Sequence, residues 1–157
     1  MNVFMGFDLY GVKAVSDKGE YFGNNVWYWR PLWRYVAQVC EDILTAEDIE
    51  EGGYNNGRVI EADKAAKIAE RLLSLIKDKE VRRFADEYAT ELETLPDEQC
   101  EHCAGTGERH DEYVDGQCNA CGGKGTVRPW KTWYPFSDEN VKEFAEFCRD
   151  SGGFAIG

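Results

Sequence analysis

The sequence predicts an α+β fold, in which one mostly helical single domain of residues 1–157 carries a small antiparallel sheet and an inserted hairpin at about residues 99–128. Three observations lead to this prediction: amphipathic helical periodicity over several segments, a few short strand-like segments, and two cysteine pairs between predicted helices. The chain has 157 residues, of which 43% are hydrophobic, and a chain of this length usually buries one core.

The predicted helices have apolar residues on one face and charged residues on the other. They span residues 32–44, a short segment between Thr45 and Gly52, residues 63–77, residues 80–95, and a last segment between Ser137 and Gly152. Pro31 is favoured at a first helical position, and Thr45 and Ser137 are favoured N-caps. Cys40 and Cys148 fall on apolar faces, so we expect both in the core.

Strand signals are fewer and shorter than helix signals. Residues 3–10, 20–22 and 154–156 have the length and composition of small antiparallel strands. Residues 125–130 are also predicted to be extended, and residues 54–57, Tyr-Asn-Asn-Gly, have the composition of a turn. We therefore expect the sheet to be small beside the helices.

Charge sets the first limits on function. Thirty acidic against eighteen basic residues give a net charge of −12, which repels phosphate and disfavours nucleic-acid or anionic-membrane binding. A partner protein with a basic surface fits this charge better. No apolar stretch approaches the roughly 20 residues of a transmembrane helix, and residues 1–8 contain no basic leader, so we expect a cytoplasmic protein.

Four of the six cysteines lie in a pattern that occurs twice. Residues 100–107 read CEHCAGTG and residues 118–125 read CNACGGKG, so both match C-x-x-C-x-G-x-G. Two residues between cysteines let one short turn present both sulfurs to one metal, and glycine permits the positive φ that such a knuckle needs. The fourteen residues between Cys103 and Cys118 are slightly fewer than in a typical zinc ribbon, but they suffice for a short hairpin.

The spacing predicts one structural zinc ion, Zn²⁺, bound by Cys100, Cys103, Cys118 and Cys121. Four thiolates leave no open coordination position, so we expect this zinc to fold the hairpin and not to activate water. A disulfide pair and a redox C-x-x-C are the alternatives, and a reducing cytoplasm disfavours the disulfides. His102 and His110 could replace a ligand, but we expect both to be exposed polar side chains.

The doubled motif resembles half of the cysteine-rich zinc domain of DnaJ-type chaperones, over residues 100–125 only. That family has four such repeats and a J domain with a His-Pro-Asp triad, whereas this sequence has two repeats and no such triad. The resemblance therefore implies zinc ligation by the four cysteines and does not imply co-chaperone activity. A nucleic-acid ribbon is disfavoured, because residues 86–115 contain eleven acidic side chains and one basic one, Arg109.

Residues 21–33, YFGNNVWYWRPLW, concentrate aromatic, amide and arginine side chains. Aromatic faces stack on ligands, amides donate and accept hydrogen bonds, and an arginine near a helix N-terminus favours an anion. The candidate ligand-binding residues are Asn24, Asn25, Trp27, Trp29 and Arg30, with Asp8 and Tyr10 on a neighbouring strand. The alternative is a core, because Trp and Tyr supply much of the apolar area of a small domain.

Nearly the whole chain resembles a group of small uncharacterised proteins encoded by phages and prophages. The resemblance is carried by the segments MGFDLYG, GEYF, NNVWYWRPLW and SGGF, together with the doubled cysteine motif. It implies a phage accessory protein that works in the host-cell cytoplasm, and it implies no activity.

An interaction protein needs only the features found so far. We therefore expect a non-enzymatic accessory protein that has a structural zinc site and binds a host protein or a small ligand. Catalytic signals are sparse, since no serine lies in a nucleophile elbow and no phosphate-binding or dinucleotide motif is present. The alternatives are an enzyme of unknown reaction that uses residues 21–33, or a polypeptide-binding, chaperone-like module. The sequence names no catalytic residue and no oligomeric state.

Overall fold

The computed structural model describes residues 6–157, and the part of the first predicted strand at residues 3–5 lies outside them. The described chain has the predicted α+β fold, with several helices and a small antiparallel sheet. It forms two compact units, which consist of residues 6–89 with 134–157 and of residues 90–133. The second unit contains the predicted insertion. That both units belong to one folding domain stays a prediction.

The first unit is built on a four-stranded antiparallel sheet with the order β2-β1-β8-β3. Its strands are β1 (Gly6–Gly11), β2 (Tyr21–Asn25), β3 (Arg58–Ile60) and β8 (Phe154–Ile156). Side chains alternate along β1, so that Phe7 and Leu9 are buried while the residues between and after them face away. Leu9 lies opposite Phe22 on one side and Ile156 on the other, which gives the sheet one apolar face.

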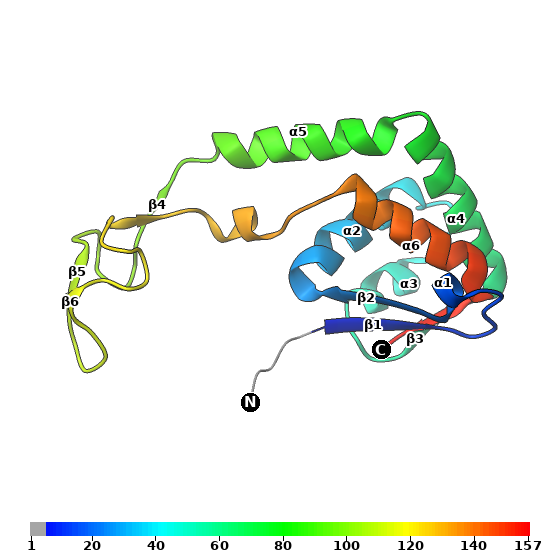
Figure 1. Cartoon of the computed structure of the whole chain (residues 1–157), viewed down its shortest axis with the longest axis horizontal. Helices are drawn as coiled ribbons and strands as arrows, with labels where there is room; N and C mark the ends of the chain where they lie inside the picture. The colour runs from blue at the N-terminus through cyan, green and yellow to red at the C-terminus, as the bar shows by residue number, and fades with distance from the viewer. Residues whose placement is uncertain (1–5) are drawn as a thin grey trace. The chain divides into compact units, whose positions relative to one another are not determined.

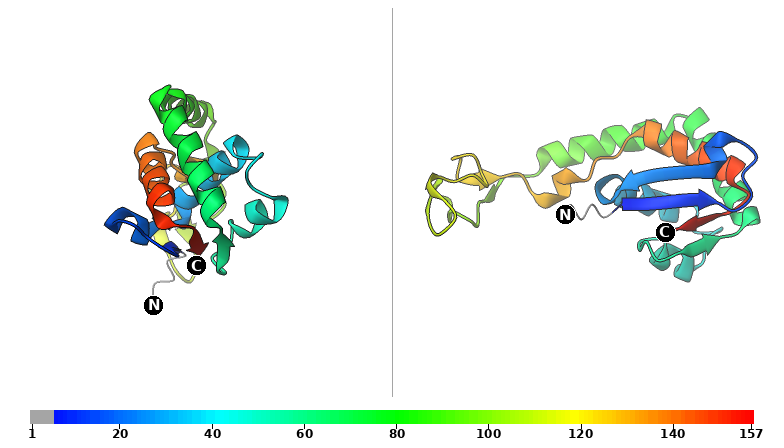
Figure 2. Two further views of the ribbon diagram at one scale, coloured as in Figure 1. Left: turned by 90° about the vertical axis from the view of Figure 1, so that its right-hand side faces the viewer. Right: turned by 60° about the horizontal axis from the view of Figure 1, so that its bottom comes forward.

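Helices pack on the apolar face of this sheet. They are α1 (Asp17–Glu20), α2 (Val26–Val39), α3 (Ala46–Glu51), α4 (Ala62–Lys77) and α6 (Asp138–Ser151), while α5 (Glu80–Thr94) runs from the first unit into the second. Figure 1 shows α2, α4 and α6 on the same side of β1 and β2, and the right-hand view of Figure 2 looks onto the strands from the other side. Among residues 6–157, no helix combines the length and the apolar character needed to cross a membrane.

A group of phenylalanines connects α6 to the sheet. Phe144 and Phe147 of α6 contact Phe22 of β2 and Phe154 of β8, with ring centroids 5.3 to 5.9 Å apart. Tilted and edge-to-face pairs at this distance add to the free energy gained from burial alone. Cys40 and Cys148 are buried in the same core, as predicted.

Most of the predicted helices and caps are confirmed. α4 and α5 match the predictions for residues 63–77 and 80–95 to within one residue at each end. Thr45 Oγ1 accepts a hydrogen bond from the Asp48 N–H at 3.0 Å, and Ser137 Oγ accepts one at 3.0 Å from the N–H three residues later. Local capping chemistry therefore fixed where α3 and α6 begin.

The predicted helix start at Pro31 is wrong. α2 begins five residues earlier, because the Asn25 side chain accepts a hydrogen bond from the Tyr28 N–H at 3.0 Å and caps the helix there. Pro31 consequently lies inside α2, where it lacks the N–H that would bond the carbonyl four residues before it. The helix also ends earlier than predicted, at Val39, and the Cys40 carbonyl accepts the bonds that form the following turn.

A buried ion-pair cluster joins α3 to β3 and α4. Asp48 of α3 is 1% exposed, and its carboxylate accepts hydrogen bonds from Arg58 at 2.7 and 3.1 Å and from Lys64 at 2.6 Å. Burial opposes ionisation of this carboxylate, but Lys64, Arg58 and Thr45 donate to it and hold the pKa of Asp48 well below its usual value. The cluster therefore fastens three elements of the first unit around one negative charge.

The second unit contains short strands and one turn of 3₁₀-helix. The elements are β4 (Glu98–Gln99), β5 (Glu108–His110), β6 (Asp115–Gln117), β7 (Thr126–Val127) and η1 (Trp130–Trp133). β4 pairs with β7 and β5 pairs with β6, both antiparallel. The prediction of an extended segment over residues 125–130 is thus right only for β7, because the chain turns into η1 at Trp130.

Candidate metal centre

The structure brings the four motif cysteines to one point in the second unit. Cys100, Cys103, Cys118 and Cys121 are buried, and their sulfurs all lie within 4.8 Å of one another. The sulfur–sulfur distance is 4.0 Å between Cys100 and Cys118 and 3.8 Å between Cys103 and Cys121. Four thiolates at a metal–sulfur distance of about 2.3 Å would have tetrahedral edges of about 3.8 Å. The four sulfurs are therefore placed to hold one metal ion.

The two motifs have the same local structure. In each knuckle the first cysteine's carbonyl accepts a hydrogen bond from the N–H five residues later, at 3.1 Å in one and 3.0 Å in the other. The Gly107 N–H donates to Cys103 Sγ, and the Gly125 N–H donates to Cys121 Sγ, both at 3.2 Å. Equivalent cysteines of the two knuckles are eighteen positions apart in the sequence. The sequence repeat is thus also a structural repeat around the cysteines.

The strands around the knuckles form two nested ladders. β4, which precedes the first knuckle, pairs with β7, which follows the second, and β6, which precedes the second, pairs with β5, which follows the first. The Cys100 N–H donates to the Gly125 carbonyl and the Cys118 N–H donates to the Gly107 carbonyl, both at 2.9 Å. Each knuckle is therefore bonded at both ends to the other one.

The cysteines make up the core of the second unit. They form a cluster of their own, and Val127 is the partly buried apolar residue packed against it. The first unit, in contrast, has its own large core of aliphatic and aromatic side chains. A buried cluster this small gains little from the hydrophobic effect, so a metal ion bound by the sulfurs would add much to its stability.

Electrostatic surroundings favour thiolate at part of the site. Burial opposes ionisation of Cys103, but the Gly107 N–H and the neighbouring thiols outweigh it and lower the pKa of Cys103 to about 6. Arg109 supplies a positive charge, because its guanidinium interacts with Cys118 and lies 2.7 Å from the Asp111 carboxylate. The Arg109 side chain is only 13% exposed. Sequence reasoning treated Arg109 only as a lone basic residue and missed this role.

Neither histidine belongs to the sulfur cluster. His102 and His110 are both exposed, as predicted. His110 lies at the outer hairpin, where its Nδ1 is 2.6 Å from the Asp115 carboxylate. The four cysteines are the metal-ligand group that residues 6–157 contain.

The structure separates the five candidate ligand-binding residues of the aromatic segment. Trp29 is fully buried, and its indole N–H donates to the Gly52 carbonyl at 2.9 Å. Its ring stacks on Phe7 and Trp33 at centroid distances of 5.4 and 5.3 Å. Trp29 is therefore a core residue, in agreement with the alternative that the sequence left open.

The two asparagines have structural partners. Asn24 and Asn140 exchange two side-chain hydrogen bonds, at 3.0 and 2.9 Å, which join β2 to α6. Asn25 is the N-cap of α2. Both amides thus contribute to the fold of the first unit.

Trp27 and Arg30 lie together at the surface. Trp27 is 39% exposed and its ring centroid is 4.8 Å from that of Tyr134. Arg30 is exposed, and its Nη1 lies 3.5 Å from the hydroxyl oxygen of the same tyrosine. A ligand-binding role for the five candidates stays a prediction. Of the five, Trp27 and Arg30 lie next to the same tyrosine at the surface of the first unit.

Asp8 and Tyr10, the neighbours expected from the first strand, contact Tyr21. The Tyr21 hydroxyl donates to the Asp8 carboxylate, and the Tyr10 and Tyr21 rings lie 5.4 Å apart. The hydrogen bond to Asp8 raises the pKa of Tyr21 to about 12. These three side chains occupy the face of the sheet opposite the buried one.

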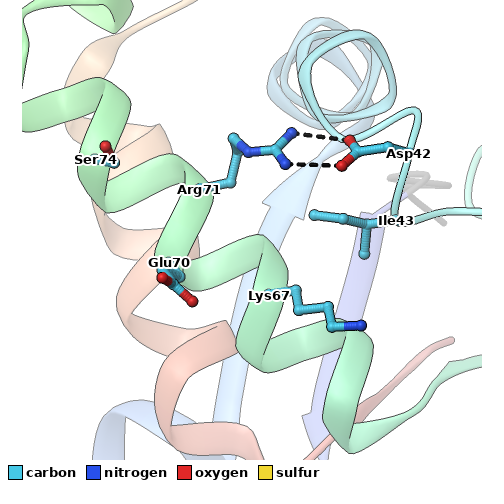
Figure 3. Close-up of a pocket in the computed structure, with 6 residues that line it drawn as sticks. All are labelled: Asp42, Ile43, Lys67, Glu70, Arg71 and Ser74. Carbon is cyan, nitrogen blue, oxygen red and sulfur yellow. Dashed lines mark hydrogen bonds and ion pairs between the residues drawn. The ribbon is translucent and has the colours of Figure 1, made fainter.

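A groove of about 420 Å³ also lies in the first unit, between α4 and the turn after α2. Figure 3 shows Arg71 of α4 directed at Asp42, which it meets with two hydrogen bonds of 2.9 and 2.8 Å. The Arg71 hydrogen bonds lower the pKa of Asp42 to about 2. Since each charge is paired with the other, Arg71 and Asp42 offer little to a charged ligand.

Comparison with known proteins finds no matching family model, no similar curated protein and no similar solved structure.

Proposed function

We propose that the protein is a non-enzymatic, phage-type accessory protein that binds a basic host protein in the cytoplasm, with one zinc ion as the structural support of its second unit. The observation that carries the proposal is the cysteine cluster: four buried sulfurs within 4.8 Å of one another form the buried cluster of the second unit. A metal in such a place stabilises a surface for binding.

Zinc is the ion that suits this ligand set. Tetrahedral four-sulfur sites in proteins bind zinc or iron, and structural zinc sites use closed sets of four cysteines. A closed set leaves no coordination position for water or substrate. The ion would thus hold the nested ladders of the second unit together.

Native mass spectrometry of the protein purified without chelator tests the metal. We expect the mass of one zinc ion per chain and no absorption in the visible range. A protein that carries iron would be coloured, and a protein that carries no metal after purification under reducing conditions would contradict the proposal. The same spectrum reports the oligomeric state and any retained small ligand.

The partner is inferred from charge. The whole chain has a net charge of −12, and residues 90–133 contain nine acidic and four basic side chains. A thiolate cluster of four negative charges with one divalent ion adds further negative charge to this unit. Such a surface attracts basic proteins and repels nucleic acid.

Salt dependence tests this role. The immobilised, zinc-loaded chain would be incubated with purified basic and acidic proteins at about 0.1 M and about 1 M salt, where the screening length falls from about 10 Å to about 3 Å. We expect basic proteins to be retained at low salt and released at high salt. Retention of acidic proteins, or retention that salt does not weaken, would contradict the proposed charge-directed binding.

A further inference from the structure

A surface groove of about 400 Å³ lies within the second unit, beside the cysteine cluster. One wall is formed by Trp130 and Trp133, which are 63% and 56% exposed. They lie three residues apart on η1, and side chains at this spacing on a 3₁₀-helix are stacked one above the other. Val127 extends this apolar wall to the cysteines, against which it packs.

Acidic side chains also line the groove. Glu98 and Glu101 are both exposed and line it. Glu98 lies directly across the β4–β7 ladder from Val127, so the two side chains are neighbours on one face. Within the described part of the chain, neither glutamate has an ion-pair partner. Two negative charges and two indole rings therefore line the same groove.

The arginine in the groove does not neutralise these glutamates. Arg128 lies 2.8 Å from the Asp97 carboxylate and donates to the carbonyls of Leu92 and Leu95, both at 2.7 Å. The Arg128 charge is paired with that of Asp97. Its N–H groups are also hydrogen-bonded to carbonyls at the end of α5 and in the segment that follows. The charges left over in the groove are thus the two carboxylates.

We infer that this groove binds a cationic side chain, arginine or lysine, on the basic partner protein. The faces of indole rings attract a guanidinium or ammonium group, and nearby carboxylates balance its charge. The inference rests on the proposed function and deepens it, because it names the surface that the partner contacts. Sequence reasoning missed this pair of tryptophans, although the W-x-x-W spacing of residues 130–133 is visible in the chain.

The test uses the full-length, zinc-loaded chain and four capped pentapeptides: glycine peptides with a central arginine, lysine, norleucine or glutamate. The readout is the NMR signals of the tryptophan indole N–H groups, with the buried Trp29 as an internal reference. We expect the arginine and lysine peptides to shift the signals of Trp130 and Trp133. Norleucine, which has an apolar side chain of similar length, should leave them unchanged.

Two pairs of charge substitutions locate the binding. Glu98→Gln with Glu101→Gln is expected to weaken binding of the arginine peptide about tenfold, since it removes both carboxylates from the groove. The matched control is Glu93→Gln with Glu112→Gln, which removes the same charge from exposed positions of the same unit. The control should bind like the wild type, and metal content is measured for every variant. Substitution of both tryptophans by alanine should abolish the binding, which is measured for this variant by isothermal titration calorimetry because the two indole signals are lost with the side chains.

The outcomes separate the inference from the proposed function. If the norleucine peptide shifts the two signals as strongly as the arginine peptide, or if the groove and control variants bind equally, the inference is wrong. If basic proteins are still retained in a salt-dependent way by the groove variants, the proposed function holds and only the location is wrong. If no basic protein or peptide binds at all, both are wrong.

Discussion

Gly107 and Gly125 each lie against the other knuckle of the cysteine centre. A Cβ added to Gly107 would lie 2.5 Å from the Gly123 carbonyl oxygen, and one added to Gly125 would lie 2.5 Å from the Gly105 carbonyl oxygen. Both glycines also have a positive φ, of 81° and 77°. Two separate constraints therefore favour glycine at the last position of each motif: the positive φ of the residue and the close approach of the other knuckle.

We expect Gly125→Ala to lower the metal affinity about tenfold to a hundredfold. The alanine would be strained at this φ, and its methyl group would push the knuckles apart and displace the N–H that donates to Cys121. Competition with a chromophoric chelator measures the affinity.

Gly122→Ala is the matched control for this substitution. Gly122 has a φ of 64° and open space around its Cα, and the equivalent residue of the first knuckle is already an alanine, Ala104, with a φ of 53°. This variant should keep the affinity within a few-fold of the wild type. An equal loss in both variants would show that positive φ alone, and not contact between the knuckles, determines the effect.

Removal of the metal is expected to make four thiols reactive and leave two protected. The metal-site cysteines belong to a small cluster with little else to bury them, whereas Cys40 and Cys148 lie in the core of the first unit. Burial raises the pKa of Cys40 to about 11 and that of Cys148 well above its usual value. A thiol-reactive dye should thus react rapidly with four groups after chelation and with six after denaturation. Rapid reaction of all six after chelation alone would mean that the first unit depends on the metal as well.

Asp48→Asn is expected to destabilise the first unit by about 2–4 kcal/mol at pH 7, because Arg58 and Lys64 would lose the buried charge that they share. Urea unfolding of the metal-free chain, followed by circular dichroism, measures the change. A change below about 1 kcal/mol would show that the cluster adds little to stability.

The same substitution should change the response to acid. The pKa of Asp48 is lower in the folded protein than in the unfolded chain, so the unfolded chain takes up the proton first as the pH falls below about 4. The wild type should therefore lose stability below that pH, and the variant should lose less of it. Asp42 and Asp150, each with a pKa lowered to about 2, act in the same direction in both proteins. Equal loss in wild type and variant would contradict a dominant role for Asp48.

Trp29→Ala is expected to cost about 3–5 kcal/mol, the range typical of a large buried aromatic side chain. Trp27→Ala, two residues away at the surface, should cost about 1 kcal/mol or less. Thermal or urea unfolding measures both. Equal costs would mean that the aromatic segment does not divide into a buried and an exposed part as the structure describes.

The sequence predicted best where the decisive interactions are local. The helical spacing of α4, the capping side chains of Thr45 and Ser137, and the two-residue gap within each cysteine pair all act within one or two turns of chain. The fold class follows from these elements, and the four cysteines are brought together as their repeat suggests.

The features that the sequence did not predict are of two kinds. In some, two residues each signal a helix start, and in others a strand pairs with a segment far away in the chain. Asn25 and Pro31 both mark helix starts, and the asparagine cap defines the start of α2. Trp27, Trp29 and Arg30 have similar sequence surroundings, and only the position of the α2 start shows which of them faces the core. β3 has three residues and pairs with a strand almost a hundred residues later, so local patterns do not reveal it.

The nested pairing of the strands also sets the order in which this segment can form as the chain is made. The first cysteine pair leaves the ribosome early, but β4 has no strand to pair with until β7 has been synthesised. At about 5–20 residues per second, the chain from Cys103 to Val127 takes roughly one to five seconds to make. Until Cys118 and Cys121 have been made, the first pair would be a half-site with two ligands, which would bind zinc weakly. β5 and β6 can pair before β7 exists, so closure of the β4–β7 ladder, together with capture of a metal ion by all four sulfurs, would be the last step in the folding of this segment.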